Sequence, residues 1–327
     1  MNKTKYETKD PCSLCGGHEA KLLQRLAKGN AVKCKNCGLI FVDPMPEIND
    51  YDEIYGGQYY EGGWRFSKRG YTDPLLQDIM IEGFGRELKE VEKFIDVKGR
   101  VLDIGCADGQ WLRVAKANGW DTFGVESSEY SRSIAIDKYG LNVVGGTFEE
   151  ATFPDDYFDL IVMRHLIEHL RNPLQSLEIC NKILKHGGVI LIETDNADGI
   201  RGNWIIILSK IFYHVPKFIK KMYWKYKGLS RDEIAKRTVQ QYPGGYGRMG
   251  PPVHLFYFSK ETLQEMLLKV GFEIIKSKSV GYGDKIYHPM PWRYKVNPIE
   301  LFLRIVEDLG QKLFKKGDII VLIGRKI

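Results

Sequence analysis

Residues 101–111 read VLDIGCADGQW, an apolar β-prone run that leads into a turn of small residues. Gly105, Ala107 and Gly109 leave little side-chain bulk in this turn, so a bound ligand can approach the backbone directly. Asp103 lies near the carboxyl end of the predicted strand, where open α/β sheets bind their ligands. The stretch therefore predicts a nucleotide-binding turn that involves Asp103, Gly105, Cys106, Ala107 and Gly109.

Two nucleotide chemistries use such a turn, and the spacing of the small residues separates them. A dinucleotide fingerprint requires Gly-x-Gly-x-x-Gly, but the corresponding positions are Gly105, Ala107 and Gln110. The stretch instead resembles motif I of class I S-adenosylmethionine-dependent methyltransferases, hydrophobic-hydrophobic-Asp-hydrophobic-Gly-x-x-x-Gly. The resemblance extends over about residues 99–195 and 253–327. It implies S-adenosylmethionine as cofactor and a Rossmann-like α/β fold, with helices on both faces of a seven-stranded mixed sheet.

The length and composition of the chain limit its architecture. With 327 residues and 43% hydrophobic side chains, it can form one α/β domain of ordinary size with a small appendage. The net charge of +6 is mild and would suit an anionic partner without requiring one. No apolar run approaches the roughly 20 residues of a membrane-spanning helix, and the first residues, MNKTKYETKD, lack the apolar core of a signal peptide. We therefore expect a cytoplasmic protein.

Four of the six cysteines form two close pairs near the amino terminus. Cys12 and Cys15 are followed, after 18 residues, by Cys34 and Cys37, and a glycine follows each pair. This spacing is typical of zinc ribbons, in which four thiolates hold a structural Zn²⁺ tetrahedrally. The alternative is a set of unrelated cysteines in a reducing compartment. We predict a zinc-ribbon-like segment over residues 1–45, whose folding depends on the metal.

The segment between the cysteines and the turn, residues 46–98, combines an aromatic linker with a predicted helical cover. The cysteine pairs, an apolar strand, Pro-x-Pro and paired tyrosines together resemble zinc-ribbon methyltransferases of sugar and surface-polysaccharide pathways. Tyr59, Tyr60 and Trp64 could therefore line an acceptor pocket, because flat aromatic rings stack on sugars. Packing of the linker against the domain is the alternative for these rings.

The remaining cofactor contacts are expected after the next two predicted strands. Glu126 ends the stretch DTFGVE, and in the resembling family an acid at this place holds the ribose hydroxyls. Ser127 follows it and, together with the next serine, can cap the following helix. Thr147 stands where the family usually has an aspartate at the adenine, so Phe148 and Glu149 are expected beside that base.

His165, Glu168 and His169 follow the fourth predicted strand as His-x-x-Glu-His. On a helix this spacing would place both histidines on one face, and the same pattern is that of an inverted zinc-protease motif. The preceding buried strand argues against a protease, and related quinone-pathway methyltransferases use a similar element, with further carboxylates, for a divalent cation. We expect Arg164 and His165 to line the cofactor and the point of methyl transfer.

Two insertions, at about 197–252 and 283–316, interrupt the predicted methyltransferase domain of residues 99–327. The first contains NWIIILSKIFYHVPKFIKKMYWKYKG, whose apolar positions follow a helical period while its lysines fall largely on another face. It is either a lid or ordinary packing, or a basic surface that contacts the inner face of a membrane and reaches a lipid-linked substrate. His254 then opens HLFYFSKETL, a pattern that recurs in the resembling family with the histidine facing the acceptor.

Methyl transfer from a sulfonium is an in-line displacement, so the protein mainly aligns donor and acceptor and removes a proton from the acceptor. Histidine suits this task near neutral pH, and the candidate bases are His254, His165 and His169. We predict transfer to a small-molecule acceptor, namely a hydroxyl or carbon of a sugar or glycoconjugate. The alternatives are an RNA methyltransferase that uses its zinc ribbon to bind RNA, and a non-catalytic zinc-ribbon scaffold. The modest charge and the lack of an Asn-Pro-Pro-Tyr-like element after the fourth strand disfavour nucleic acid as a partner.

Overall fold

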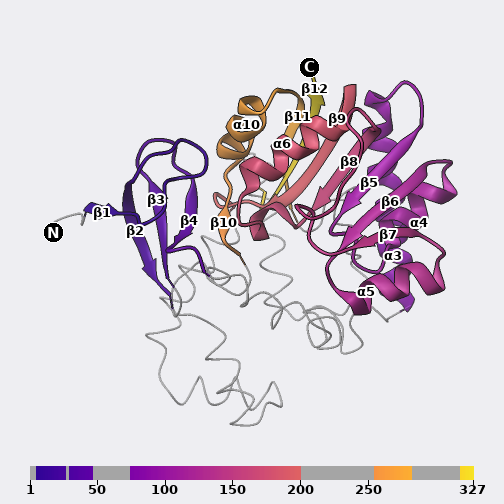
Figure 1. Ribbon diagram of the computed structural model, residues 1–327, viewed down its shortest axis with the longest axis horizontal. Helices are drawn as coiled ribbons and strands as arrows, with labels where there is room; N and C mark the ends of the chain where they lie inside the picture. The colour runs from indigo at the N-terminus through magenta and orange to yellow at the C-terminus, as the bar shows by residue number, and fades with distance from the viewer. Residues whose placement is uncertain (1–4, 27–28, 47–73, 200–253, 282–316) are drawn as a thin grey trace, which may run out of the picture.

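The computed structural model describes residues 5–26, 29–46, 74–199, 254–281 and 317–327. Figure 1 shows these residues as a large α/β domain with a small sheet beside it. Three predictions lie outside the described residues: the aromatic linker with Tyr59, Tyr60 and Trp64, the amphipathic segment of the first insertion, and the second insertion.

The large domain is built on the predicted seven-stranded mixed sheet, whose strand order is β7-β6-β5-β8-β9-β12-β11. Strands β5 to β9 are parallel, whereas β12 runs antiparallel to both of its neighbours. The chain proceeds from β5 toward one edge and then returns to place β8 on the other side of β5. The carboxyl ends of β5 and β8 therefore form the crevice where open α/β sheets bind ligands. The strands are β5 (Arg100–Ile104), β6 (Asp121–Glu126), β7 (Asn142–Gly145), β8 (Phe158–Arg164), β9 (Leu184–Asp195), β11 (Phe272–Val280) and β12 (Ile319–Lys326).

Helices cover both faces of this sheet, as predicted, and create two apolar layers (Figure 1). Alternate strand residues point to opposite faces, so Val101 and Val162 pack with α3 and α4, while Leu102 and Met163 pack with α6 and α10. These side chains are fully buried, which explains why the strands read as nearly continuous apolar runs. The helices are α3 (Pro74–Val91), α4 (Gln110–Ala117), α5 (Glu129–Ser133), α6 (Pro173–Ile183) and α10 (Lys260–Lys269).

The small sheet is antiparallel and has five strands in the order β1-β2-β3-β4-β10. Four strands come from the cysteine-containing segment, called the ribbon below, but β10 (Phe256–Tyr257) comes from beyond β9. Phe41 stacks on Phe256 with ring centroids 6.4 Å apart, and Leu14 and Phe41 belong to the same apolar layer as α6 and α10. The ribbon is therefore packed on the large domain. Its strands are β1 (Lys5–Glu7), β2 (Glu19–Arg25), β3 (Asn30–Cys34) and β4 (Ile40–Asp43).

The segment after β8 differs from the helical interpretation of its sequence. β8 ends at Arg164, His165 adopts a positive φ of 49°, and Ile167–His169 form a single 3₁₀ turn. Because the two histidines are not one turn apart on an α-helix, the geometry of the zinc-protease motif is not formed.

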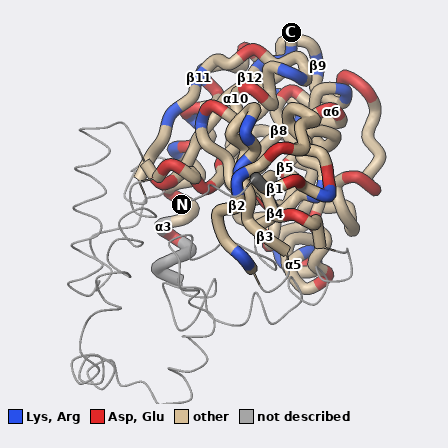
Figure 2. The backbone as a smooth tube through the Cα atoms, turned by 90° about the vertical axis from the view of Figure 1, so that its left-hand side faces the viewer, with Lys and Arg blue, Asp and Glu red and all other residues tan. Residues whose placement is uncertain are grey.

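The described residues show neither a segregation of charge nor a helix that could span a membrane. Basic and acidic residues are interspersed along the described backbone (Figure 2), in keeping with the modest net charge of +6. Of the helices within the described ranges, none is long and apolar enough to cross a bilayer.

Candidate functional site

The turn after β5 has a backbone that favours small residues. Gly105, Ala107 and Gly109 have positive φ values of 74°, 49° and 77°. A Cβ at Gly109 would lie 2.4 Å from Leu141 Cδ1, and a Cβ at Gly105 would lie 3.1 Å from the side chain of Leu166. The first contact explains why glycine is needed immediately before α4. The second places the segment after β8 directly against the turn.

Glu126, at the end of β6, connects this strand to the turn after β5. Its Oε2 accepts a hydrogen bond from Ala107 N at 2.9 Å, and its Oε1 accepts one from Ser128 N at 2.8 Å. Burial raises the pKa of Glu126, and the hydrogen bonds from Ser128 and Ala107 oppose this rise. A carboxylate offers about four lone-pair sites, so about two remain for the hydroxyls of a ligand. The acid expected to hold a ribose is thus fixed at the turn.

The other predicted residues of this edge differ in accessibility. Cys106 is buried behind the turn, and its amide donates to Val125 O at 3.1 Å. Ser127 is exposed, while Ser128 forms the predicted helix cap by accepting a hydrogen bond from Ser131 N with its Oγ. Ser127 is therefore the more accessible of the two serines to a ligand.

The residues expected at the adenine are held by neighbouring elements. Phe148 is buried in the apolar layer shared with α6, and Glu149 Oε1 accepts a hydrogen bond from Ser176 Oγ of α6 at 2.6 Å. Thr147 is exposed, and its amide donates to Glu150 Oε2 at 2.9 Å. These contacts fix the loop after β7 against α6 and leave Thr147 and Glu149 at its surface.

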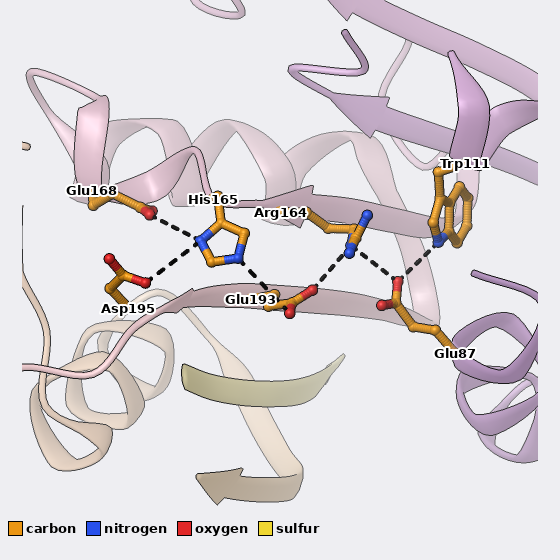
Figure 3. A network of polar contacts seen from close by, with 7 residues as sticks. All are labelled: Glu87, Trp111, Arg164, His165, Glu168, Glu193 and Asp195. Atoms are coloured by element: carbon orange, nitrogen blue, oxygen red, sulfur yellow. Dashed lines mark hydrogen bonds and ion pairs between the residues drawn. The ribbon is translucent and has the colours of Figure 1, made fainter. Parts of the chain in front are cut away.

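A chain of charged side chains crosses the carboxyl ends of β8 and β9 (Figure 3). Arg164 Nε lies 3.0 Å from Glu193 Oε2 and 3.3 Å from Glu87 Oε1, and Glu87 accepts a hydrogen bond from Trp111 Nε1 at 2.8 Å. Burial raises the pKa of Glu87 to about 8, with Arg164 opposing this rise and Glu193 adding to it. The sequence indicated Arg164 at this place but not its partner Glu87, because a glutamate on a helix ordinarily faces solvent.

Asp103 lies on the same face of the sheet as this network. It is only 4% exposed within β5, so its carboxyl is beneath the turn rather than open to solvent. Burial raises the pKa of Asp103 to about 7, with Arg164 opposing this rise and Glu126 adding to it. Asp103 therefore titrates near neutral pH. Its carboxyl interacts electrostatically both with Glu126 at the turn and with Arg164 at the end of β8.

His165 lies among three carboxylates (Figure 3). Its Nδ1 is 3.4 Å from Glu168 Oε1 and 4.0 Å from Asp195 Oδ1, and its Nε2 is 3.9 Å from Glu193 Oε1. Burial lowers the pKa of His165, but the hydrogen bond with Glu168 and the charges of Glu193, Glu168 and Asp195 raise it to about 9. His165 is therefore an imidazolium at neutral pH, which suits holding an anionic group better than accepting a proton.

His169 and His254 meet beside this network. Their rings make an edge contact with centroids 4.8 Å apart, and their nitrogens lie with a carboxylate oxygen of Glu168 within 4.8 Å of one another. His254 is buried and His169 is half-buried, so the pair is reached from the side of His169. Two imidazoles and a carboxylate can accept a proton or hold a divalent cation. The structure thus brings two of the three predicted bases together, and Glu168 lies between this pair and His165.

The four cysteines of the ribbon converge. Cys12 Sγ lies 3.5 Å from Cys37 Sγ, Cys15 Sγ lies 3.5 Å from Cys34 Sγ, and all four thiols are within 4.8 Å of one another. Zinc–sulfur bonds of about 2.3 Å in a tetrahedron place the sulfurs about 3.8 Å apart, so the thiols fit this ion. The hydrogen bond with Cys37 lowers the pKa of Cys12 to about 5, against the effect of burial, whereas the same bond and burial raise the pKa of Cys37. The thiolate is the form that binds a metal.

Known proteins resemble the chain in sequence. A family model described as a methyltransferase domain matches residues 76–277. The ubiquinone biosynthesis O-methyltransferase of Dinoroseobacter shibae is 32% identical over 176 residues, which cover 51% of this chain and 68% of that protein. The demethylmenaquinone methyltransferase of Staphylococcus saprophyticus is 23% identical over 231 residues, which cover 67% of this chain and 90% of that protein. A solved SAM-dependent methyltransferase from Archaeoglobus fulgidus shares 20% identity at a TM-score of 0.48, over 78% of this chain and all of that chain.

Proposed function

The chain belongs to the methyltransferase-domain family and is an S-adenosylmethionine-dependent methyltransferase, and we propose that it methylates a hydroxyl or an acidic carbon of a small-molecule acceptor. The adjacency of two parts of the site carries this proposal. Leu166 lies against Gly105 of the turn, and the same segment continues to His169, which meets His254. A methyl donor at the turn would therefore lie next to a pair of proton acceptors.

Each part of the site has a chemical task in this proposal. S-adenosylmethionine, when bound, supplies a methyl group on a sulfonium, from which displacement is easy once donor and acceptor are aligned. Glu126 would accept hydrogen bonds from the ribose hydroxyls at its remaining lone pairs. His254 would accept the proton that the acceptor loses, with His169 as the second candidate. His165, as a cation, would balance the surrounding carboxylates.

For the acceptor we propose a sugar or glycoconjugate. The cysteine pairs and the Pro-x-Pro that follows them support this choice through the resemblance to sugar-pathway methyltransferases. The basic amphipathic insertion would suit a lipid-linked version by contact with an anionic membrane surface. A hydroxylated ring of quinone type is the second candidate, which the names of the similar ubiquinone and menaquinone enzymes favour.

Transfer of label from S-adenosylmethionine labelled in its methyl group tests the proposal. The acceptors are nucleotide-linked sugars, a lipid-linked glycan, a hydroquinone and RNA, and the proteins are the wild type, His254→Ala and His186→Ala. His186 is an exposed histidine beside Ile327, so its variant is the matched control. We expect label in a small-molecule acceptor, about 10²-fold slower transfer by His254→Ala and unchanged transfer by the control.

Two outcomes would contradict the proposal. Equal turnover by His254→Ala and the wild type would exclude His254 as the base. Label that enters RNA alone, in a reaction that weakens steeply with salt, would favour the RNA methyltransferase instead.

We also propose that Cys12, Cys15, Cys34 and Cys37 hold a structural Zn²⁺. Their convergence supports this, as does the positive φ of 73° at Gly16, which turns the chain back toward the thiols. A site with four thiolates is closed to substrate, so the metal would stabilise the ribbon rather than react. Metal analysis should find about one zinc per chain, and less in Cys37→Ser; a wild type without zinc would contradict the assignment.

A further inference from the structure

β10 belongs to the ribbon sheet, yet it follows the candidate base almost directly. Phe256 and Tyr257 pair with Phe41 and Ile40 of β4 in antiparallel register. His254 lies just before this strand, separated from it by a single residue. A strand of two residues is too short to be stable alone, so β10 depends on β4 for its position.

Leu255, the residue between His254 and β10, connects the ribbon to the turn Ile167–His169 of the large domain. The carbonyl of Leu255 accepts a hydrogen bond from Val42 N of β4 at 2.9 Å, and its amide donates to Glu168 O at 2.8 Å. Its side chain is 2% exposed and lies in the apolar layer shared by the ribbon and the large domain. Leu255, the residue after His254, is thus hydrogen-bonded both to β4 and to the turn that carries Glu168 and His169.

The cysteines act on the same strand of the ribbon. Cys34 ends β3, Cys37 lies in the turn that leads to β4, and Cys34 N donates to Leu39 O at 2.9 Å across this turn. A metal held by these thiolates would close the turn and fix the start of β4. A second link runs from α10 to the first cysteine pair, where Lys269 Nζ donates to Leu14 O at 2.7 Å.

We propose that the metal-closed ribbon is the frame that positions the candidate base, with Leu255 as the positioning residue between β4 and the turn Ile167–His169. This inference rests on the proposed zinc site and on the proposed role of His254. Loss of the metal releases β4, and with it β10, Leu255 and the histidine pair. The cofactor turn keeps its geometry, because the bond between Glu126 and Ala107 lies within the large domain.

Removal of one thiolate from the full chain tests this coupling. Cys37→Ser takes away a ligand in the turn between β3 and β4, and Cys180→Ser is the matched control because that thiol is buried in α6. The measurements are the zinc content, the hydrogen-exchange rate of the Leu255 amide and the dissociation constant of S-adenosylmethionine. A fourth readout is the titration of the His254 imidazole by NMR, with His186 as internal reference. The same readouts are taken on wild type after chelation, so that failure to fold during expression does not decide the result.

We expect zinc loss to speed exchange of the Leu255 amide about tenfold or more and to shift the His254 titration, while the dissociation constant of S-adenosylmethionine changes by less than about twofold. A protein that loses zinc but keeps the wild-type exchange rate and titration would overturn the proposal. Loss of cofactor binding together with zinc would also overturn it, because the ribbon would then support the whole fold. A wild type that holds zinc but binds no S-adenosylmethionine would instead contradict the cofactor site alone.

Discussion

Replacing His165 with glutamine removes a cation from among three carboxylates and tests the charge network directly. Burial lowers the pKa of this imidazole, but Glu168, Glu193 and Asp195 raise it from the ordinary 6.5 to about 9. The folded protein therefore binds this proton more tightly than the unfolded chain does. The resulting stabilisation is fully present below about pH 6.5 and is lost as the pH rises through about 9.

The size of the effect follows from the difference between the two pKa values of His165. A rise from 6.5 to about 9 corresponds to at most about 3 to 4 kcal/mol, at about 1.4 kcal/mol per pKa unit. The side chain is 33% exposed, so solvent screens its ion pairs and reduces the expected contribution to about 1–2 kcal/mol. Between about pH 6.5 and 9, the free energy of unfolding of the wild type should fall by this amount relative to that of His165→Gln.

Two buried carboxyls also lower the free energy of unfolding as the pH rises. Their contribution must be distinguished from that of His165. Burial raises the pKa of Glu87 to about 8 and that of Asp103 to about 7, so their contributions are present at low pH and are lost as the pH rises through these values. Both groups remain in the variant. The difference between the two proteins therefore reports mainly on His165.

Urea unfolding at several pH values between about 6 and 9.5 measures this difference. His186→Gln is the control, because His186 is exposed and its ring contacts the backbone of Ile327. We expect the control to follow the wild type over the whole range, and His165→Gln to have a flatter pH dependence. A wild-type curve that stays parallel to that of His165→Gln would refute the reasoning and return His165 to the candidate bases.

Three further substitutions test the cofactor turn and the buried ion pairs. Glu126→Ala should weaken S-adenosylmethionine binding about 10²-fold in calorimetry, because hydrogen bonds to a charged group are worth about 1.5–3 kcal/mol, whereas exposed Glu129→Ala should leave it unchanged. Gly109→Ala should lower the free energy of unfolding by about 1–3 kcal/mol, since its φ is 77° and the new Cβ would lie 2.4 Å from Leu141; an unchanged melting temperature would contradict this. Arg164→Met should cost about 3–5 kcal/mol in urea unfolding above about pH 8, where Glu87 is charged in the wild type and two buried carboxylates lose their cation, and a loss below about 1 kcal/mol there would contradict this.

The geometry of the turn after β5 could be predicted because its signals are local, whereas the cofactor contacts of its residues stay a prediction. An apolar run, the small residues at Gly105 and Gly109 and the acid Glu126 follow from strand period and turn geometry. The structure places them at the ends of adjacent strands, with Glu126 bonded to the turn itself. The spacing of the four cysteines is equally local, and their thiols converge.

The acceptor half depends on contacts between distant segments, which a periodic pattern does not specify. β10 pairs with β4, so Phe256 meets Phe41, although neither stretch identifies its partner. The spacing from His165 to His169 suits a helix, but His165 leaves β8 with a positive φ and the chain forms only a 3₁₀ turn. Tertiary contacts also decide its charge, since Glu193 belongs to a neighbouring strand.

Charge at the crevice bears on the choice between acceptors. Acidic groups outnumber cations there: the described residues include Glu126, Glu168, Glu193 and Asp195 against Arg164 and His165, and Asp103, with a pKa of about 7, adds a partial negative charge at neutral pH. This surplus suits a donor with a positive sulfonium and repels a polyanionic backbone. An RNA acceptor would need basic residues from outside the described ranges to bring a phosphate chain to the transfer point. A neutral hydroxyl of a sugar or of a hydroxylated ring meets no such barrier, so the electrostatics favour a small acceptor group over nucleic acid.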